Sequence, residues 1–254
     1  MRGILTTKEA QLIFVDTPGI HKPHHQLGKV LVQNALRAIN AVDIILFVVD
    51  SSVKLGKGDT FIVQLLQQTK NPIILGLNKS DLQPTNPGEL DESYAKIAEE
   101  QGWSFVKFSA STKQGLNNLH VKLISQLDSG PYYYSPDLIT DQPERFIMGE
   151  LIREQILLHT RQEIPHSVAI TIEKIEEVKS ITRIIAAINV ERDSQKGILI
   201  GKGGKMLKTI GTSARQEMEK LIVGKVYLKL FVKVTPKWLQ SPQILVELGY
   251  SLEN

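Results

Sequence analysis

Leu12-Ile13-Phe14-Val15-Asp16-Thr17-Pro18-Gly19 is a short apolar run that ends in an acid, a proline and a glycine. Four apolar residues without alternation predict a strand buried on both faces, which is typical of a parallel α/β sheet. Ligands of such sheets bind beyond the carboxyl ends of the strands, where Asp16 lies. A carboxylate in that position can hold Mg²⁺ through water, and Gly19 leaves room for a backbone N–H to approach a phosphate. A plain turn would accept the same residues.

A second run of this kind, residues 72–77, ends in Asn78-Lys79-Ser80-Asp81. The Asp81 carboxylate can accept the N1–H and the exocyclic amine of guanine, whereas adenine offers no such pair of donors. We expect Asn78 to support the base and the stem of Lys79 to lie along it. The sequence therefore predicts a loop that selects guanine over adenine.

A third predicted strand, residues 104–108, leads into Ser109-Ala110-Ser111. The side chains of this loop are small enough for its backbone to approach the same base. Taken alone, each of the three loops is also compatible with an ordinary polar loop after a strand. Their order along the chain and their positions at strand ends indicate a GTP-binding protein.

The composition limits the class of protein. The 254 residues are 42% hydrophobic, which is ample for one or two globular domains, and they include no cysteine, as is compatible with a reducing cytosol. The longest apolar run, residues 44–49, is far shorter than the roughly 20 residues of a membrane helix, and the N-terminus lacks a signal-peptide pattern. The sequence thus predicts a soluble, cytoplasmic protein.

The net charge of +3 is unevenly distributed along the chain. Residues 196–237 contain ten Lys or Arg and two acids, Glu217 and Glu219, so ten minus two leaves a local excess of eight positive charges. An excess of this size in one segment indicates a polyanionic partner.

Apolar patterns predict that strands and helices alternate over the first half of the chain. A further strand is expected over 44–49, and helices over 27–38, 59–68, 89–100 and 115–127, with Asp59 as an N-cap. Residues 1–8 are too few for a full strand and its upstream helix. This alternation predicts a doubly wound α/β sheet with right-handed crossovers. The loop 20–26 contains three histidines (His21, His24 and His25), which lack the partner Cys or acids of a metal site, and a mobile loop at this place suits a nucleotide-sensing switch better.

The composition changes at residues 128–143, which contain three prolines, a glycine and Tyr132-Tyr133-Tyr134. We place the domain boundary there, with one domain over 1–129, a linker over 130–144 and a second domain over 145–254. We expect the tyrosines to dock the linker onto a domain rather than to stack on nucleic-acid bases. In the second, α+β domain, patterns predict a helix over 145–158, antiparallel strands over 168–172 and 182–190, a helix ending at Leu221 and a strand over 226–234.

A glycine-rich loop, Gly201-Lys202-Gly203-Gly204-Lys205, is the second chemical centre. Glycines at both ends of a four-residue loop that opens a helix let a sugar-phosphate backbone approach, and Lys202, Lys205 and Lys208 add positive charge. A KH module clamps single-stranded RNA in this way. The alternative is a plain glycine turn between two helices, but the strands before the loop and the basic segment after it favour RNA binding.

Together these patterns resemble the Era family of bacterial GTPases over essentially the whole chain, including the tail 238–250. The resemblance is carried by Asp16-Thr17-Pro18-Gly19, Asn78-Lys79-Ser80-Asp81, Ser109-Ala110-Ser111, the segment from Glu144-Arg145-Phe146 through Ile152-Arg153-Glu154, and Ile200-Gly201-Lys202-Gly203-Gly204-Lys205. It implies a Ras-like GTPase domain joined to a type II KH domain that binds the 3′ end of 16S ribosomal RNA during assembly of the 30S subunit. It also implies GTP, GDP and Mg²⁺ as ligands, a monomer, and a peripheral association with the inner membrane.

Two features depart from what such a protein would contain. Ile20 lies where Ras-like proteins carry the glutamine that orients the attacking water, so hydrolysis would be slow or would position its water differently. No G-x-x-x-x-G-K-[ST] occurs, and only 15 residues precede Asp16. The chain therefore resembles an N-terminally truncated Era protein that lacks the first strand, the phosphate loop and the first switch.

Two functions therefore stay open. The chain is either a GTP-hydrolysing ribosome-assembly protein whose sequence is incomplete, or an RNA-binding KH module in which a GTPase remnant is a scaffold. A family with two tandem GTPase domains is disfavoured because a single Asn-Lys-x-Asp is present.

Overall fold

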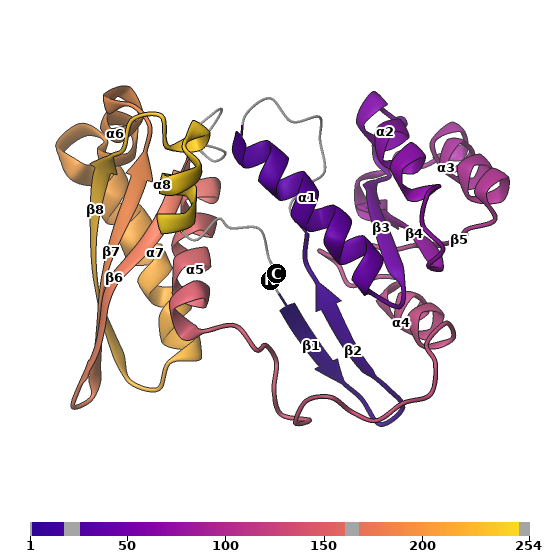
Figure 1. The fold of residues 1–254 in the computed structure, drawn as a ribbon, viewed down its shortest axis with the longest axis horizontal. Helices are drawn as coiled ribbons and strands as arrows, with labels where there is room; N and C mark the ends of the chain where they lie inside the picture. Colours follow the sequence, from indigo (N-terminus) through magenta and orange to yellow (C-terminus); the bar gives the residue numbers. More distant parts are fainter. Residues whose placement is uncertain (1, 18–25, 161–167, 249–254) are drawn as a thin grey trace. The chain divides into compact units, whose positions relative to one another are not determined.

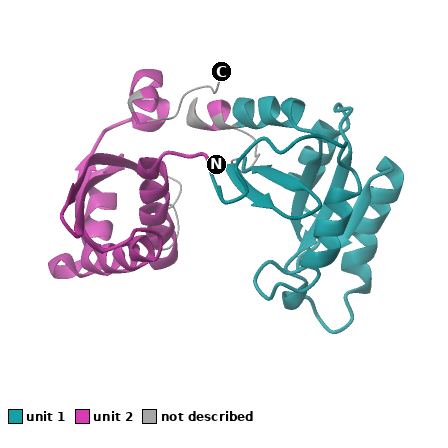
Figure 2. Cartoon of the chain, turned by 90° about the horizontal axis from the view of Figure 1, so that it is seen from below, with its two compact units in different colours: residues 1–22, 31–140 teal, residues 23–30, 141–254 magenta. Residues whose placement is uncertain are grey.

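The computed structural model describes residues 2–17, 26–160 and 168–248. The chain divides into two compact units, one of residues 1–22 and 31–140 and the other of residues 23–30 and 141–254 (Figure 2). The division between Thr140 and Asp141 falls inside the stretch predicted as a linker. We call the two parts unit 1 and unit 2 and describe each by itself.

Unit 1 contains a parallel sheet of three strands in the order β3 (Ile45–Asp50), β4 (Ile73–Asn78) and β5 (Ser104–Lys107). Helices α2 (Lys57–Leu66) and α3 (Gly88–Gln101) cover one face, and α4 (Leu116–Ile124) covers the other (Figure 1). Residues 73–77 of β4 are all buried, because side chains of this central strand meet a core on each face. The predicted doubly wound arrangement is confirmed.

A hairpin of β1 (Arg2–Thr6) and β2 (Gln11–Val15) forms a separate two-stranded antiparallel sheet. The prediction that residues 12–15 form a parallel strand buried on both faces is therefore wrong. Leu12 joins the core, whereas Phe14, two residues further on the same face of the strand, is 40% exposed, so the core covers only part of that face. The segment 1–8, predicted to be too short for a strand with its helix, contains β1 alone.

The helices of unit 1 follow the predicted positions with one correction. Helix α1 spans Gln26–Ala41, and α3 and α4 lie within one to three residues of the predicted ends. Helix α2 begins at Lys57 and ends at Leu66, and Asp59 is not its N-cap. The N-cap is Gly56, and Asp59 lies three residues later, where its Oδ2 accepts a hydrogen bond of 2.8 Å from the Gly56 N–H. Asp59 thus takes the acidic position of a capping box, three residues after the N-cap, and satisfies the free N–H of Gly56.

The tyrosine-containing segment docks on the β1–β2 hairpin, as predicted. The Tyr132 hydroxyl donates to the Thr7 carbonyl at 2.8 Å, and Gln11 Oε1 accepts from the N–H groups of Tyr133 and Tyr134, both at 2.9 Å. Tyr133 leaves 78% of its surface exposed, so the backbone rather than the aromatic rings makes much of this contact.

Unit 2 is an α+β domain whose sheet has the order β6 (Val168–Val178), β7 (Ile181–Val190) and β8 (Lys225–Val234). Strands β6 and β7 are antiparallel, as predicted, and β7 and β8 are parallel. Helices α5 (Glu144–His159), α6 (Asp193–Ile200) and α7 (Lys205–Leu221) pack against one face around the buried Ile152, Ile188 and Ile210. A short helix α8 (Pro242–Glu247) follows. Helix α6 was not predicted, because its eight residues bury one side chain, Leu199, and show no helical apolar period.

Candidate functional site

The carboxyl ends of β3 and β4 lie side by side, and they bring the loop 78–81, which the sequence predicts to select guanine, to the edge of the sheet. Asp50 is the register partner of Asn78, the last residue of β4. The Asn78 carbonyl accepts hydrogen bonds from Ser51 N–H at 2.9 Å and from Ser51 Oγ at 2.7 Å. Ser51 is completely buried, so these bonds fix the backbone from which the loop 78–81 begins.

The side chain of Asn78 joins two of the predicted loops. Its Oδ1 accepts from the N–H of Lys79 at 2.8 Å and from the N–H of Ala110 at 3.0 Å. A third bond, from Ser80 N–H to the Phe108 carbonyl at 3.2 Å, closes the same junction. The loops after β4 and β5 are thus held together by the residue that the sequence predicted to support the base.

Lys79 has a backbone φ of 63°, in the left-handed region that non-glycine residues adopt rarely. Its Nζ lies 2.6 Å from Asp50 Oδ2. Hydrogen bonds donated by Lys79 and, to a smaller extent, by Ser52 Oγ lower the pKa of the Asp50 carboxyl from 3.8 to about 2. Asp50 was missed by the sequence prediction, although an acid directly after a buried strand is the signal that selected Asp16.

The loop after β5 is built from small residues that are tied to one another. Ser109 is fully buried, its N–H donates to the Gln114 carbonyl at 2.8 Å, and its Oγ accepts from Thr112 N–H at 3.1 Å. Gly115 has a φ of 75°, and a Cβ there would lie 2.5 Å from the Lys107 carbonyl oxygen. The tight course of this loop leaves Ala110 and Ser111 exposed at the surface.

Asp81 lies in a single turn of 3₁₀ helix, Ser80–Leu82, with its side chain exposed. Asp16 is exposed directly after β2, and Thr17 follows it. The predicted residues Pro18, Gly19 and Ile20 and the three histidines of the loop 20–26 lie outside the described residues. Within the described ranges no cluster of three His, Asp or Glu could hold a metal by itself. A Mg²⁺ near Asp16 would need further ligands from outside the protein, such as water and nucleotide phosphates.

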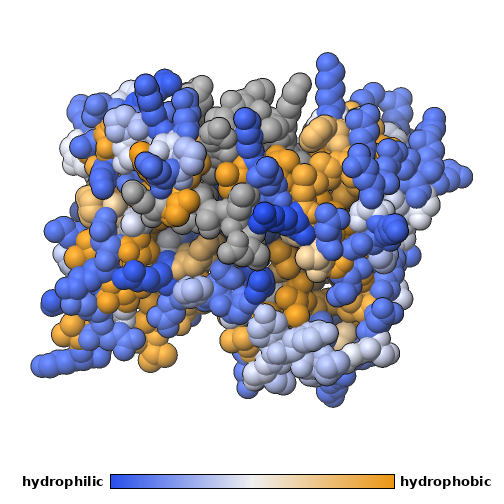
Figure 3. Space-filling model, in the orientation of Figure 1, coloured by the Kyte–Doolittle hydropathy of each residue, from blue (hydrophilic) through white to orange (hydrophobic). Residues whose placement is uncertain are grey.

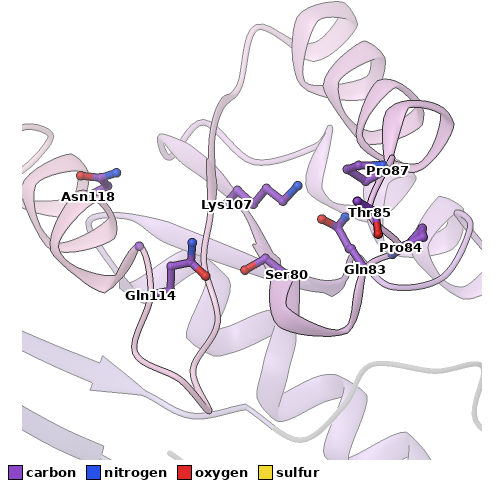
Figure 4. Close-up of a pocket in the computed structure, with 9 residues that line it drawn as sticks. Ser80, Gln83, Pro84, Thr85, Pro87, Lys107, Gln114 and Asn118 are labelled. Atoms are coloured by element: carbon purple, nitrogen blue, oxygen red, sulfur yellow. The ribbon is translucent and has the colours of Figure 1, made fainter.

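A separate cavity of about 420 Å³ lies beside the loop 78–81 (Figure 4). It shares Ser80 with that loop, but Asn78, Lys79 and Asp81 do not line it. Its lining residues are Ser80, Gln83, Pro84, Thr85, Pro87, Lys107, Gln114, Gly115 and Asn118. The Lys107 ammonium in its wall is held by Asp91 Oδ2 at 2.6 Å.

The glycine-rich loop of unit 2 connects α6 to α7 through a 3₁₀ turn, Lys202–Gly204. Gly201, Gly203 and Gly204 have φ values of 69°, 61° and 76°, a region that glycine adopts without the steric cost of a side chain. A Cβ at Gly201 would lie 2.8 Å from the Met206 Cβ, whereas Gly203 and Gly204 have open space around them. The loop therefore presents bare backbone with the exposed side chains of Lys202 and Lys205 beside it, and Lys208 is exposed one turn further along α7.

A groove of about 420 Å³ begins at this loop and runs between α7 and β8. It is lined by Gly204, Leu207, Lys208, Gly211, Thr212, Arg215, Tyr227, Leu228, Lys229 and Leu230. Arg215 is held by Glu219 at 2.9 Å, and a hydrogen bond from Val226 N–H lowers the pKa of that glutamate. The groove combines an apolar floor with cationic walls, as expected for bases bound against a phosphate-contacting rim.

Sequence comparisons agree with the two units. Residues 1–79 match the family described as 50S ribosome-binding GTPase, and residues 163–239 match the KH domain family. The fold and the candidate sites thus define a protein class in which a Ras-like GTPase domain of α/β type precedes a KH domain.

The chain is 69% identical to GTPase Era of Rippkaea orientalis, covering all of this chain and 81% of that protein. The chain belongs to the Era family of GTPases. Two solved structures are also similar. Era in complex with MgGDPNP and nucleotides 1506–1542 of 16S ribosomal RNA is 32% identical, with a TM-score of 0.92 over 99% of this chain and 86% of that one. Aquifex aeolicus Era bound to GDP·AlF₄⁻ is 33% identical, with a TM-score of 0.90 over 99% of this chain and 87% of that one.

Proposed function

We propose that this chain binds a guanine nucleotide at the edge of the β3–β4–β5 sheet and the 3′ end of 16S ribosomal RNA in the groove of unit 2, and that it acts in assembly of the 30S subunit. The main support is the solved relative that holds both MgGDPNP and 16S ribosomal RNA and aligns with this chain at a TM-score of 0.92. The predicted truncation stays a prediction.

At the nucleotide site each residue has a distinct role. Asp81 would accept the two guanine donors, and Lys79 would lie along the base plane. Asn78 supports this arrangement through its bonds to Lys79 and Ala110. Mg²⁺, when bound, supplies charge neutralisation at the phosphates, and Asp16 would hold one of its waters.

At the RNA site the open backbone of Gly203 and Gly204 would let a phosphate approach the N-terminus of α7. Lys202, Lys205 and Lys208 would contact neighbouring phosphates, and the bases would lie on the apolar floor formed by Leu207, Leu228 and Leu230. This arrangement supports a single-stranded ligand, because paired bases could not reach the floor.

Replacing Lys202 and Gly203 with Asp tests the RNA site. The parent chain should bind an oligonucleotide from the 16S 3′ end with a log–log salt slope of roughly −0.7 per phosphate contact. The double variant should bind at least about tenfold more weakly, a loss of about 1.4 kcal/mol, as measured by fluorescence anisotropy. Equal affinity in a variant that circular dichroism shows to be folded would identify the loop as an ordinary glycine turn.

The second candidate function is an RNA-binding KH module whose GTPase part is a scaffold. The observation that favours it is the absence of a G-x-x-x-x-G-K-[ST] segment from the 254 residues. Nucleotide affinity separates the two functions.

No helix among the described residues is long and apolar enough to cross a bilayer. We further propose a cytoplasmic monomer that associates peripherally with the inner membrane.

A further inference from the structure

The face of the unit 2 sheet that points away from α5, α6 and α7 carries an unusual pattern on its edge strand. Lys225, Tyr227, Lys229, Phe231 and Lys233 of β8 alternate with the buried or half-buried residues of the core face, and all five are exposed. Because alternate residues of a strand point to one face, these five side chains form a row. We call this row the outer row.

The outer row presents free positive charge. Among the residues that the structure describes, Lys225, Lys229 and Lys233 form no ion pair or side-chain hydrogen bond, and the same holds for Arg183, the register partner of Tyr227 on β7. Glu176 of β6, the register partner of Arg183, is held by Lys174 at 2.6 Å. Of the three lysines, Lys225 interacts electrostatically with Glu219. The cations are therefore available to a polyanion.

The two aromatic side chains of the row are available for stacking. Tyr227 is 55% exposed and Phe231 is 38% exposed, and a rise of about 3.3 Å per residue separates them by about 13 Å, with Lys229 between them. On the face of unit 2 that Figure 3 shows, hydrophilic and hydrophobic residues are interspersed. Alternating cations and aromatic faces bind single-stranded nucleic acid without requiring a particular sequence.

We propose that the outer row is a second contact surface for single-stranded RNA, which continues the strand that lies in the groove. Tyr227 and Lys229 belong to the row and also line the groove, so an RNA strand that leaves the groove over the edge of β8 meets the row directly. This continuity favours RNA over an anionic membrane as the ligand. The inference rests on the proposed RNA site and extends its length.

The test uses variants of residues that belong to the row but do not line the groove. Phe231→Thr removes one stacking face and keeps a residue suited to a strand. Lys225→Gln with Lys233→Gln removes two cations. Val223→Thr, at a fully exposed apolar position in the turn before β8, and Lys179→Gln, at the β6–β7 turn, are the matched controls.

Affinities are measured for an RNA of about four nucleotides, the length that a KH groove clamps, and for one of about twelve from the 16S 3′ end. Phe231→Thr should weaken the longer RNA about tenfold and leave the shorter one unchanged. The lysine pair should reduce the salt slope for the longer RNA by about 1.4, at about 0.7 per lost contact, and the controls should change neither.

Failure of this inference is distinct from failure of the groove. If both row variants bind the longer RNA like the parent chain, while Lys202→Asp with Gly203→Asp abolishes binding of the shorter RNA, the outer row is overturned and the groove stands. If the row variants lose binding to vesicles of anionic phosphatidylglycerol but keep their affinity for the longer RNA, the row is a membrane surface and the inference is overturned. If the parent chain does not bind the shorter RNA but Phe231→Thr still weakens the longer one, the row is supported and the groove is not.

Discussion

In the proposed nucleotide site a single carboxylate, that of Asp81, should decide which base is accepted. In Asp81→Asn the amide would present a donor where guanine also presents one, and this mismatch costs about 1–3 kcal/mol. Xanthine carries an oxygen in place of the exocyclic amine of guanine, and this oxygen can accept a hydrogen bond from the introduced amide. The Asp81→Asn variant should therefore prefer XTP to GTP. Competition between the two nucleotides, followed by saturation-transfer NMR at millimolar concentration, measures the ratio of affinities.

Asp128→Asn is the control for this experiment, because Asp128 is an exposed acid outside the predicted site. An Asp81→Asn variant with the same GTP to XTP ratio as the parent chain would show that Asp81 does not face the base.

The pair of Asp50 and Lys79 gives a pH-dependent contribution to stability. The folded state lowers the pKa of Asp50 from 3.8 to about 2, so the ionised carboxylate stabilises the fold above 3.8, and this contribution disappears as the pH falls through about 2. The side chain is 34% exposed, so solvent screening limits the effect to about 1 kcal/mol or less. Asp50→Asn should lower the free energy of unfolding in urea at pH 7 by this amount, and the difference should shrink between pH 4 and pH 2. A difference that is independent of pH would mean that packing, not charge, is lost.

At the scale of elements, the backbone geometry of the glycine-rich loop predicts that alanine substitutions at its different glycines reduce stability by different amounts. Gly201 has φ 69° and ψ 175°, a region open almost only to glycine, and a Cβ would meet Met206 at 2.8 Å. Gly201→Ala should therefore cost about 2–3 kcal/mol of stability in urea denaturation. Gly203→Ala is the matched control, since Gly203 has φ 61° and ψ 27° with open space around it, and it should cost about 1 kcal/mol. Equal costs would contradict the assigned geometry.

The sequence predicted helices and strands correctly where the apolar pattern is strong. The prediction failed where the burial of a strand depends on which strands pair with it. The central strand β4 is a continuous buried run, and the sequence predicted it within one residue at each end. Residues 12–15 show the same kind of run, but they form one half of an antiparallel hairpin with Phe14 exposed, because burial depends on which strands lie alongside. Helix α6 was missed since a short helix needs tertiary packing to form, and little of that packing is visible in its sequence.

At the candidate site, too, some contacts could be predicted from the sequence and others could not. The loops after β4 and β5 were predicted to meet because parallel strands end at a common edge, and Asn78 Oδ1 joins them. The ion pair of Asp50 with Lys79 could not be predicted, because it depends on the left-handed backbone of Lys79 and on the pairing of Asp50 with Asn78 across two strands.

At the scale of the whole molecule, the two proposed sites differ in how many of the residues they need are present in this sequence. RNA binding and nucleotide binding should therefore be separable. The proposed RNA site consists of the glycine-rich loop, α7 and β8, all of which are described within unit 2. Tight nucleotide binding also needs backbone N–H groups and a lysine around the β- and γ-phosphates, and the 254 residues contain no G-x-x-x-x-G-K-[ST] that would supply them.

The 254-residue chain should therefore bind GTP far more weakly than the micromolar range while it retains RNA binding. Contacts to the base alone give orientation and selectivity, but most of the affinity of such sites comes from charged phosphate contacts, which are stronger than neutral hydrogen bonds. Titration of a fluorescent GTP analogue in the presence of Mg²⁺ measures this, and Aquifex aeolicus Era, which has been solved with GDP·AlF₄⁻, is the positive control under the same conditions. Micromolar binding by this chain together with measurable phosphate release would reject the scaffold function and would require a phosphate site built from residues other than a G-x-x-x-x-G-K-[ST] loop.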